Sequence, residues 1–229
     1  MTFILDLIEF AVYAVLALAL LIHFRREPDL KRLHISLAFG IAALGFLFNV
    51  ADDLLYFAGY IEIAKFAFKS FDILLMIGAF YFFVFLSDFN ERLKKIKVIW
   101  YVALLGVIAA IAYLQIDYVI QGSFWTVVRS PAAGLALVFY WTVTFAIISA
   151  SFVRYAALAK SRVAKYRMWF LALGGIAAVL SYLSAVFFKF SLPNLLIASE
   201  MTSSTLAVVA GIFFYLGAEM PARLKKAFE

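Results

Sequence analysis

The chain has 229 residues, of which 67% are hydrophobic, 18% aromatic and only 15% charged. Its mean hydropathy is +1.02, whereas only about half of the residues in a soluble domain are apolar. This composition excludes a soluble kinase or nucleotide-binding domain and a disordered interaction tail, and the absence of cysteine excludes a disulfide scaffold. We therefore expect residues 1–229 to form a single integral membrane domain.

Apolar runs define seven expected membrane spans. A helix needs about 20 largely apolar residues to cross a bilayer, and seven runs of roughly that length lie between the clusters of charge. Pro28, Pro131, Pro193 and Pro221 fall in loops or at span ends, so no span is interrupted. The sequence thus predicts an all-α bundle of seven transmembrane helices. The expected spans are residues 3–23, 35–58, 62–87, 98–116, 131–153, 168–190 and 194–218.

The basic residues predict the orientation of the bundle. Sixteen of the 20 Lys and Arg follow the first, third, fifth and seventh spans, and the other four, Lys65, Lys69, Arg129 and Lys189, fall on the opposite side. Because loops rich in Lys and Arg stay in the cytoplasm, the N-terminus is expected outside and the C-terminus in the cytoplasm. The stretch before Arg25 is acidic and has no basic residue, which argues against a cleaved signal peptide.

Polar side chains inside the second and third spans are the first candidates for a functional site, because charges in lipid are costly and usually face protein or water. Asn49, Asp52 and Asp53 form a polar stripe near the outer end of the second span. Lys69 and Asp72 lie about one turn apart on the third span. The simplest expectation is that Lys69 pairs with Asp72, or with an aspartate of the second span across the helical hairpin.

The last span adds Glu200, Ser203 and Ser204 within its outer turns. Together with the polar residues of the second and third spans, they are predicted to form a pocket that is open to the exterior and binds a small ligand. Two alternatives remain open: an ion-pair cluster that fixes helix packing, or a proton or ion pathway. The pathway is disfavoured because the inner halves of the spans offer no carboxylate before Asp88.

Motifs for enzymatic or cofactor chemistry are absent from the sequence. There is no HExxH, GxSxG, Walker or dinucleotide-binding glycine motif, so we expect no enzymatic activity. His23 and His34, without any cysteine, provide no ligand set for zinc or a di-iron centre, and we expect no cofactor. Nucleic acid is not an expected partner, since the basic residues are spread over four short segments without a groove-reading motif.

Seven spans with an external N-terminus resemble the microbial rhodopsins. Lys69 and Asp72 are similar to the basic and acidic pair in the third span of that family, and Glu200 is similar to its acidic residue in the seventh. The family binds retinal through a lysine of the seventh span, and Ser204 occupies the corresponding position here. The Trp- and Pro-rich signature of the sixth span is missing from residues 169–190. The resemblance therefore implies an opsin-like bundle without a chromophore.

The chain also resembles the N-terminal seven-helix sensor region of prokaryotic histidine kinases. The length matches almost the entire chain, and the end of the last span, FFYLG at 213–217 followed by PARL at 221–224, is similar to the junction with the cytoplasmic output domain. The chain stops at Glu229, so no transmitter domain is expected to follow. The resemblance implies a multi-pass sensor of a prokaryotic cell membrane that signals through a separate partner in the membrane or cytoplasm.

We therefore expect a non-enzymatic, receptor-like sensor that contacts the lipid bilayer, a small extracellular ligand and a protein partner. Two other functions remain open. One is a structural subunit of a larger membrane complex, and the other is a carrier or channel for a small solute. The absence of proline-broken spans counts against the carrier.

Overall fold

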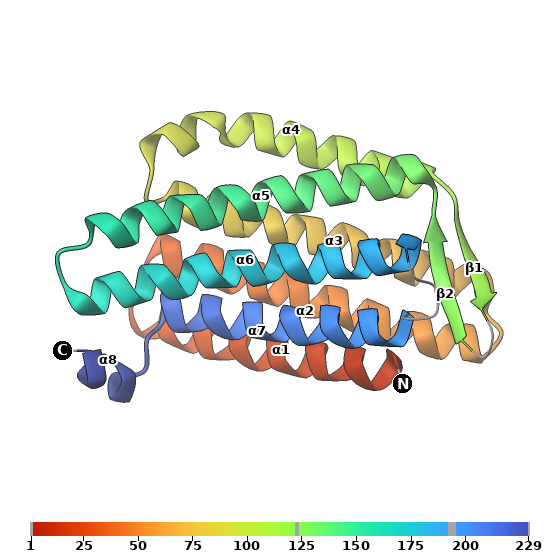
Figure 1. The fold of residues 1–229 in the computed structure, drawn as a ribbon, viewed down its shortest axis with the longest axis horizontal. Coiled ribbons are helices and arrows are strands. Elements are labelled where there is room, and N and C mark those ends of the chain that lie inside the picture. The colour runs from red at the N-terminus through yellow and green to blue at the C-terminus, as the bar shows by residue number, and fades with distance from the viewer. Residues whose placement is uncertain (1, 122–123, 192–195, 229) are drawn as a thin grey trace.

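Seven long helices, a two-stranded hairpin and a short terminal helix make up the described fold (Figure 1). The computed structural model describes residues 2–121, 124–191 and 196–228. The elements in chain order are α1 (Thr2–Arg26), α2 (Leu30–Phe57), α3 (Ile61–Ser87), α4 (Glu91–Tyr113), β1 (Ile116–Gln121), β2 (Phe124–Arg129), α5 (Pro131–Leu158), α6 (Arg162–Ser191), α7 (Leu196–Ala218) and α8 (Ala222–Phe228).

The prediction of seven membrane-spanning helices is confirmed, because seven helices within the described ranges are long and apolar enough to cross a bilayer. Several helices extend beyond the expected apolar runs, and α4 shows the reason. It begins at Glu91 rather than at residue 98, because the Asn90 side chain caps it by accepting a hydrogen bond from the Arg92 amide at 2.9 Å. The charged first turns of α4 are helical although they are not apolar, so hydropathy alone set the boundary too late.

The structure adds a β-hairpin between α4 and α5 to the predicted helical bundle. β1 and β2 pair antiparallel, with Ile116 opposite Arg129 and Tyr118 opposite Val127. Both strands are rich in β-branched and aromatic residues, which favour extended pairing. The first strand directly follows the fourth apolar run, so the expected span merged the end of α4 with the start of β1.

The helices close into a ring. Neighbours in the chain lie side by side, α1 packs against α7, and α3 also packs against α5 (Figure 1). α4 lies at the periphery, against α3 and α5. The hairpin and the N-terminus lie at one end of the bundle, which we call the hairpin end, and α8 lies at the opposite end, which we call the α8 end (Figure 1).

Aromatic side chains fill the centre of the bundle. Phe39, Phe152 and Phe214 are almost completely buried, and many leucine, isoleucine and valine side chains on the outer faces are exposed. An apolar exterior around an apolar core is what a helix bundle in lipid requires. α5 and α6 approach closely at Gly175, where an added Cβ atom would overlap the Ser149 hydroxyl and lie 3.0 Å from the Phe145 carbonyl oxygen.

Candidate functional site

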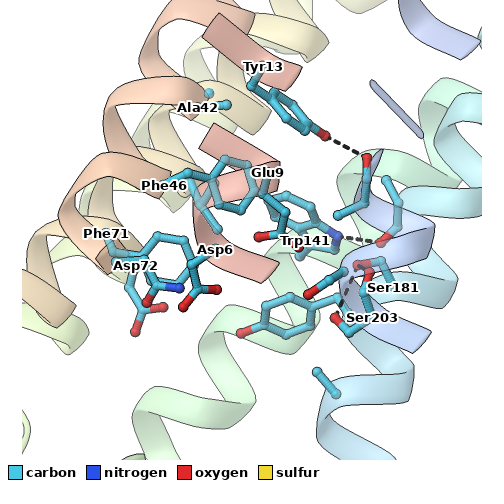
Figure 2. A pocket seen from close by; sticks show the side chains of 18 of the residues that line it. Asp6, Glu9, Tyr13, Ala42, Phe46, Phe71, Asp72, Trp141, Ser181 and Ser203 are labelled. Atoms are coloured by element: carbon cyan, nitrogen blue, oxygen red, sulfur yellow. Dashed lines mark hydrogen bonds between the residues drawn. The ribbon is translucent and has the colours of Figure 1, made fainter. Parts of the chain in front are cut away.

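A cavity of about 230 Å³ lies within the bundle toward the hairpin end (Figure 2). Side chains from α1, α2, α3, α5, α6, α7 and β2 line it, so every long helix except α4 contributes. Small residues of the lining, such as Ala42, Gly78 and Ala207, leave space between its polar and aromatic side chains. The cavity is therefore the candidate functional site.

Carboxyl groups line the part of the cavity that is nearest to the hairpin end, and we call this group the acidic rim. α1 contributes two of them, α2 two, and α3 and α7 one each. Four of the six side chains are almost fully buried, with exposed fractions between 1% and 6%. Burying a carboxyl group is unfavourable unless the surroundings compensate it, which makes the rim the most unusual feature of the fold. Its members are Asp6, Glu9, Asp52, Asp53, Asp72 and Glu200.

Two contacts link α1 to the other helices across the rim. The Asp6 side chain of α1 lies next to the Asp53 carboxyl group of α2. The Ser204 hydroxyl on α7 hydrogen-bonds Glu9 one turn further along α1. In Figure 2 the Asp6, Glu9 and Asp72 side chains point into the same space. The rim therefore joins α1, α2, α3 and α7 through side chains that face one another.

Arg129 of β2 compensates one member of the rim. Its guanidinium donates two hydrogen bonds to the Asp72 carboxylate, both at 2.7 Å, and lies 4.6 Å from the centre of the Phe68 ring. Burial by itself lowers the pKa of Arg129, but the adjacent Asp72 charge and these hydrogen bonds outweigh it and raise the pKa above its ordinary value. Arg129 is therefore permanently charged and bound to Asp72.

The expected pairing of Lys69 with Asp72 is wrong. The Lys69 ammonium instead donates to the Ala112 carbonyl at the end of α4, at 3.0 Å, and it does not line the cavity. Although the two residues are about one turn apart, Asp72 faces the bundle interior while Lys69 lies on the side of α3 that faces α4. The Asp72 partner comes from β2, which the sequence did not predict as a strand.

The hairpin covers the cavity as a lid. The Tyr118 hydroxyl on β1 donates a hydrogen bond to Asp52, and its ring lies 4.5 Å from that of Tyr56. Burial, the hydrogen bond to Asp52 and the nearby aspartate charges raise the pKa of Tyr118 above its ordinary value. Asp117 adds an ion pair to Lys65 at 3.4 Å. The lid is thus attached to both α2 and α3.

An aromatic wall forms the side of the cavity that α5 and α6 contribute. The rings of Trp141 and Tyr182 are stacked with centroids 5.5 Å apart, and the Trp141 indole donates to the Ala178 carbonyl at 2.8 Å (Figure 2). The Ser181 hydroxyl donates to the Ser203 carbonyl oxygen at 2.8 Å, which links α6 to α7 beside this wall. These contacts fix the wall in one conformation.

Three phenylalanine rings close the cavity toward the α8 end. The centroid of the Phe82 ring lies 4.5 Å from that of Phe214 and 5.7 Å from that of Phe145. All three rings are almost completely buried. We call this group the aromatic floor. The cavity therefore has an acidic rim, an aromatic wall and an apolar floor.

The structure brings together most of the residues that the sequence suggested. Every candidate except Lys69 lines the cavity; these are Asn49, Asp52, Asp53, Asp72, Glu200, Ser203 and Ser204. Whether they bind a ligand stays a prediction. Asp6, Glu9 and Arg129 also line the cavity but were not predicted as site residues. The spacing of Asp6, Glu9 and Tyr13 on one face of α1 was the available signal, because such a polar stripe in an apolar span must face protein.

The described side chains do not form a metal site. Nowhere in residues 2–121, 124–191 and 196–228 do three His, Cys, Asp or Glu side chains converge closely enough to hold one ion. The carboxyl groups of the rim are distributed around the cavity instead.

The fold and the cavity define a multi-pass, seven-helix membrane protein with an acidic, aromatic-walled cavity at one end. No protein-family model, no curated protein and no solved structure matches the chain.

Proposed function

We propose that the protein is a non-enzymatic membrane sensor that binds a small ligand in the cavity and signals to a separate partner at the α8 end. The observation that carries this proposal is the composition of the cavity lining, which draws on six of the seven long helices. A ligand there contacts almost the whole bundle, so its binding energy is available to shift the packing of helices relative to one another.

The charge distribution supports an orientation with the hairpin end outside the cell. The loops at the α8 end and α8 itself carry most of the Lys and Arg, and such loops stay in the cytoplasm. In this orientation the cavity faces the exterior through the lid, and the N-terminus of α1 lies outside. The partner then meets the protein at the cytoplasmic face, beside anionic lipid headgroups.

Contacts at the α8 end support a role for α7 in the relay. Glu219, directly after α7, accepts a hydrogen bond from Arg32 of α2 at 2.6 Å, and Arg32 also binds Glu27 at 2.5 Å. Arg167 of α6 donates to the carbonyl oxygens of Gly217 and Ala218. We call this group the α8-end network. α7 therefore contacts the cavity near its start and this network at its end, so a displacement of α7 reaches both.

The aromatic floor disfavours a carrier or channel. A solute that moved from the cavity toward the α8 end would have to pass Phe82, Phe145 and Phe214, whose rings pack against one another. A closed floor at one end of a cavity suits binding without passage.

The structural-subunit hypothesis places no requirement on the cavity. The following experiment separates it from a sensor.

A group that is covalently attached inside the cavity tests the proposal. The chain has no cysteine, so a Ser203→Cys variant is modified at one site, and neutral benzyl methanethiosulfonate then places a phenyl group in the cavity. We expect hydrogen–deuterium exchange to change at residues 27–34 and 217–224 after modification. A Tyr113→Cys variant is the control, because Tyr113 is 88% exposed.

Full modification of the Ser203→Cys variant without any change of exchange at the α8 end would contradict the sensor and favour a structural subunit. Mass spectrometry of the intact protein establishes the extent of modification. The same change in both variants would also contradict the proposal, because it would show that labelling disturbs the bundle wherever it occurs.

A further inference from the structure

We infer that the cavity binds an organic cation with an apolar body, such as an alkyl- or arylammonium compound. This inference rests on the proposed function, in which the cavity is the ligand site, and it assigns the chemical class of the ligand. It follows from three observations: the charge of the rim, the distribution of its carboxyl groups, and the aromatic wall and floor of the same cavity.

The charge balance of the lining favours a cation. Six acidic side chains and one basic side chain line the cavity within the described residues, and the basic one, Arg129, is bound by two hydrogen bonds to Asp72. The acidic side chains of the lining therefore outnumber the basic ones by five. In a cavity with low-dielectric walls this charge concentrates cations and repels anions. An anionic or neutral polar ligand would leave the rim uncompensated.

The distribution of the carboxyl groups favours a large cation over a metal ion. A divalent metal needs several oxygen ligands at about 2.0–2.6 Å from one point. The rim instead draws its carboxyl groups from four helices around the cavity, and no three His, Cys, Asp or Glu side chains in the described ranges converge on one point. Dispersed negative charge matches an ammonium group whose own charge is spread over its substituents.

The wall and floor accommodate the remainder of such a ligand. Trp141 and Tyr182 line the cavity on the side of α5 and α6, and aromatic rings attract ammonium groups through their electron-rich faces. Toward the α8 end, Phe82 and Phe214 offer a purely apolar surface. A cationic head near the rim and an apolar body on the floor therefore satisfy both chemistries of one cavity of about 230 Å³.

Charged thiol reagents measure the field in the cavity. The Ser203→Cys variant of the full chain is treated with the cationic 2-(trimethylammonium)ethyl methanethiosulfonate and with the anionic 2-sulfonatoethyl methanethiosulfonate. We expect the ratio of the cation rate to the anion rate to exceed the ratio at the Tyr113→Cys control position by a factor on the order of ten or more. An equal ratio at both positions overturns the inference.

Substitution of rim carboxyl groups by isosteric amides tests whether the rim causes this difference in rates. Glu200→Gln and Asp6→Asn, each combined with Ser203→Cys, should lower the ratio severalfold. Glu62→Gln is the matched control, because Glu62 lies at the same end, is 85% exposed and does not line the cavity. A fall in the control variant as large as that in the rim variants overturns the assignment to the rim. The unfolding temperature of each variant establishes that its fold is intact.

Equilibrium protection tests the ligand class directly. Benzyltrimethylammonium should slow the modification of the Ser203→Cys variant by neutral methyl methanethiosulfonate, and this protection should saturate. Tetramethylammonium, which lacks the aromatic body, should require roughly tenfold higher concentration. Phenylmethanesulfonate, which is the anionic counterpart, should not protect.

Protection by phenylmethanesulfonate as strong as that by the cation overturns the inference, as does the absence of protection by benzyltrimethylammonium. Neither result affects the relay between the cavity and the α8 end, because that relay is tested with a neutral tethered occupant. Failure of the ligand class and failure of the sensor are thus distinguishable.

Discussion

At the hairpin end, carboxyl groups point inward around an open cavity, whereas at the α8 end charged side chains join the ends of helices near the surface. Asp72 and its partner Arg129 illustrate the first arrangement, with side chains that are 4% and 20% exposed. Glu27 and Arg32 illustrate the second, and the Glu27 side chain is 75% exposed. Between the two ends lies the aromatic core.

This difference indicates how the bundle separates stability from binding. The aromatic core and floor bury large apolar surfaces and leave little space, so they fix the relative positions of the helices. The hairpin end retains buried carboxyl groups, which are unfavourable for folding and are compensated by the lid. A region that keeps unfavourable charge around a cavity is a region where a ligand can supply the missing compensation.

Removal of a floor ring should have the largest effect on stability. Phe214→Ala removes a ring that packs against both Phe82 and Phe145, and we expect it to lower the free energy of unfolding by about 3–5 kcal/mol. Thermal unfolding in mild detergent measures the change. Phe57→Ala is the control, because Phe57 is 70% exposed. Equal effects of the two substitutions would show that the floor does not hold the helices together.

Separation of Asp72 from its partner should have the next largest effect. Arg129→Leu leaves a buried carboxylate without its cation, and we expect a loss of about 3 kcal/mol. The double variant Asp72→Leu, Arg129→Leu should recover most of that loss, since replacement of a whole buried pair by apolar residues is often neutral. Chemical unfolding of the three proteins gives the comparison. Without recovery in the double variant, Arg129 stabilises the lid by packing and not by charge compensation.

This ion pair also shows which parts of the structure the sequence could predict. The spans were predictable because a membrane helix needs only a local run of apolar residues. The partner of Asp72 was not, because it lies 57 residues away on a strand. Local helical spacing suggested Lys69 instead, and the helix rotation that points Lys69 toward α4 is set by tertiary packing.

The hairpin and α1 were missed for different reasons. β1 and β2 are six residues each, and such short, largely apolar segments next to an apolar span carry a weak strand pattern. Asp6 and Glu9 are visible in the sequence, but an acidic stretch there without Lys or Arg was interpreted only as evidence against a signal peptide. The contacts of α1 with α2 and α7 bring those carboxyl groups to the cavity that contains Glu200.

Loss of the Tyr118 hydroxyl should have a smaller effect that depends on pH. Tyr118→Phe removes the hydrogen bond to Asp52, and we expect a loss of about 1 kcal/mol at neutral pH. Because the folded protein raises the pKa of Tyr118, the contribution is complete below the ordinary value near 10 and declines as the pH rises above it.

Unfolding by denaturant at pH values from 7 to about 11 measures the difference between the wild type and the Tyr118→Phe variant. The difference should stay constant at first and then narrow above about pH 10. A gap that widens with pH would contradict the assignment of Tyr118 as a buried donor to Asp52.

The smallest effect should come from Glu27 at the α8 end. Its hydrogen bond to Arg32 and the Arg32 charge lower the pKa of Glu27, so its contribution is present above the ordinary pKa of glutamate and is lost as the pH falls through the lowered value. The side chain is exposed, and water and salt screen the pair, so Glu27→Gln should change the unfolding temperature only slightly.

Glu219→Gln is the matched comparison, because Glu219 binds the same arginine but its side chain is only 14% exposed. We expect the larger loss for Glu219→Gln, since burial rather than the shared partner determines the strength of the contact. A larger loss for Glu27→Gln would place the main contact between helix ends in the α1–α2 loop instead of at the end of α7, and α7 would then not be the helix that joins the cavity to the α8-end network.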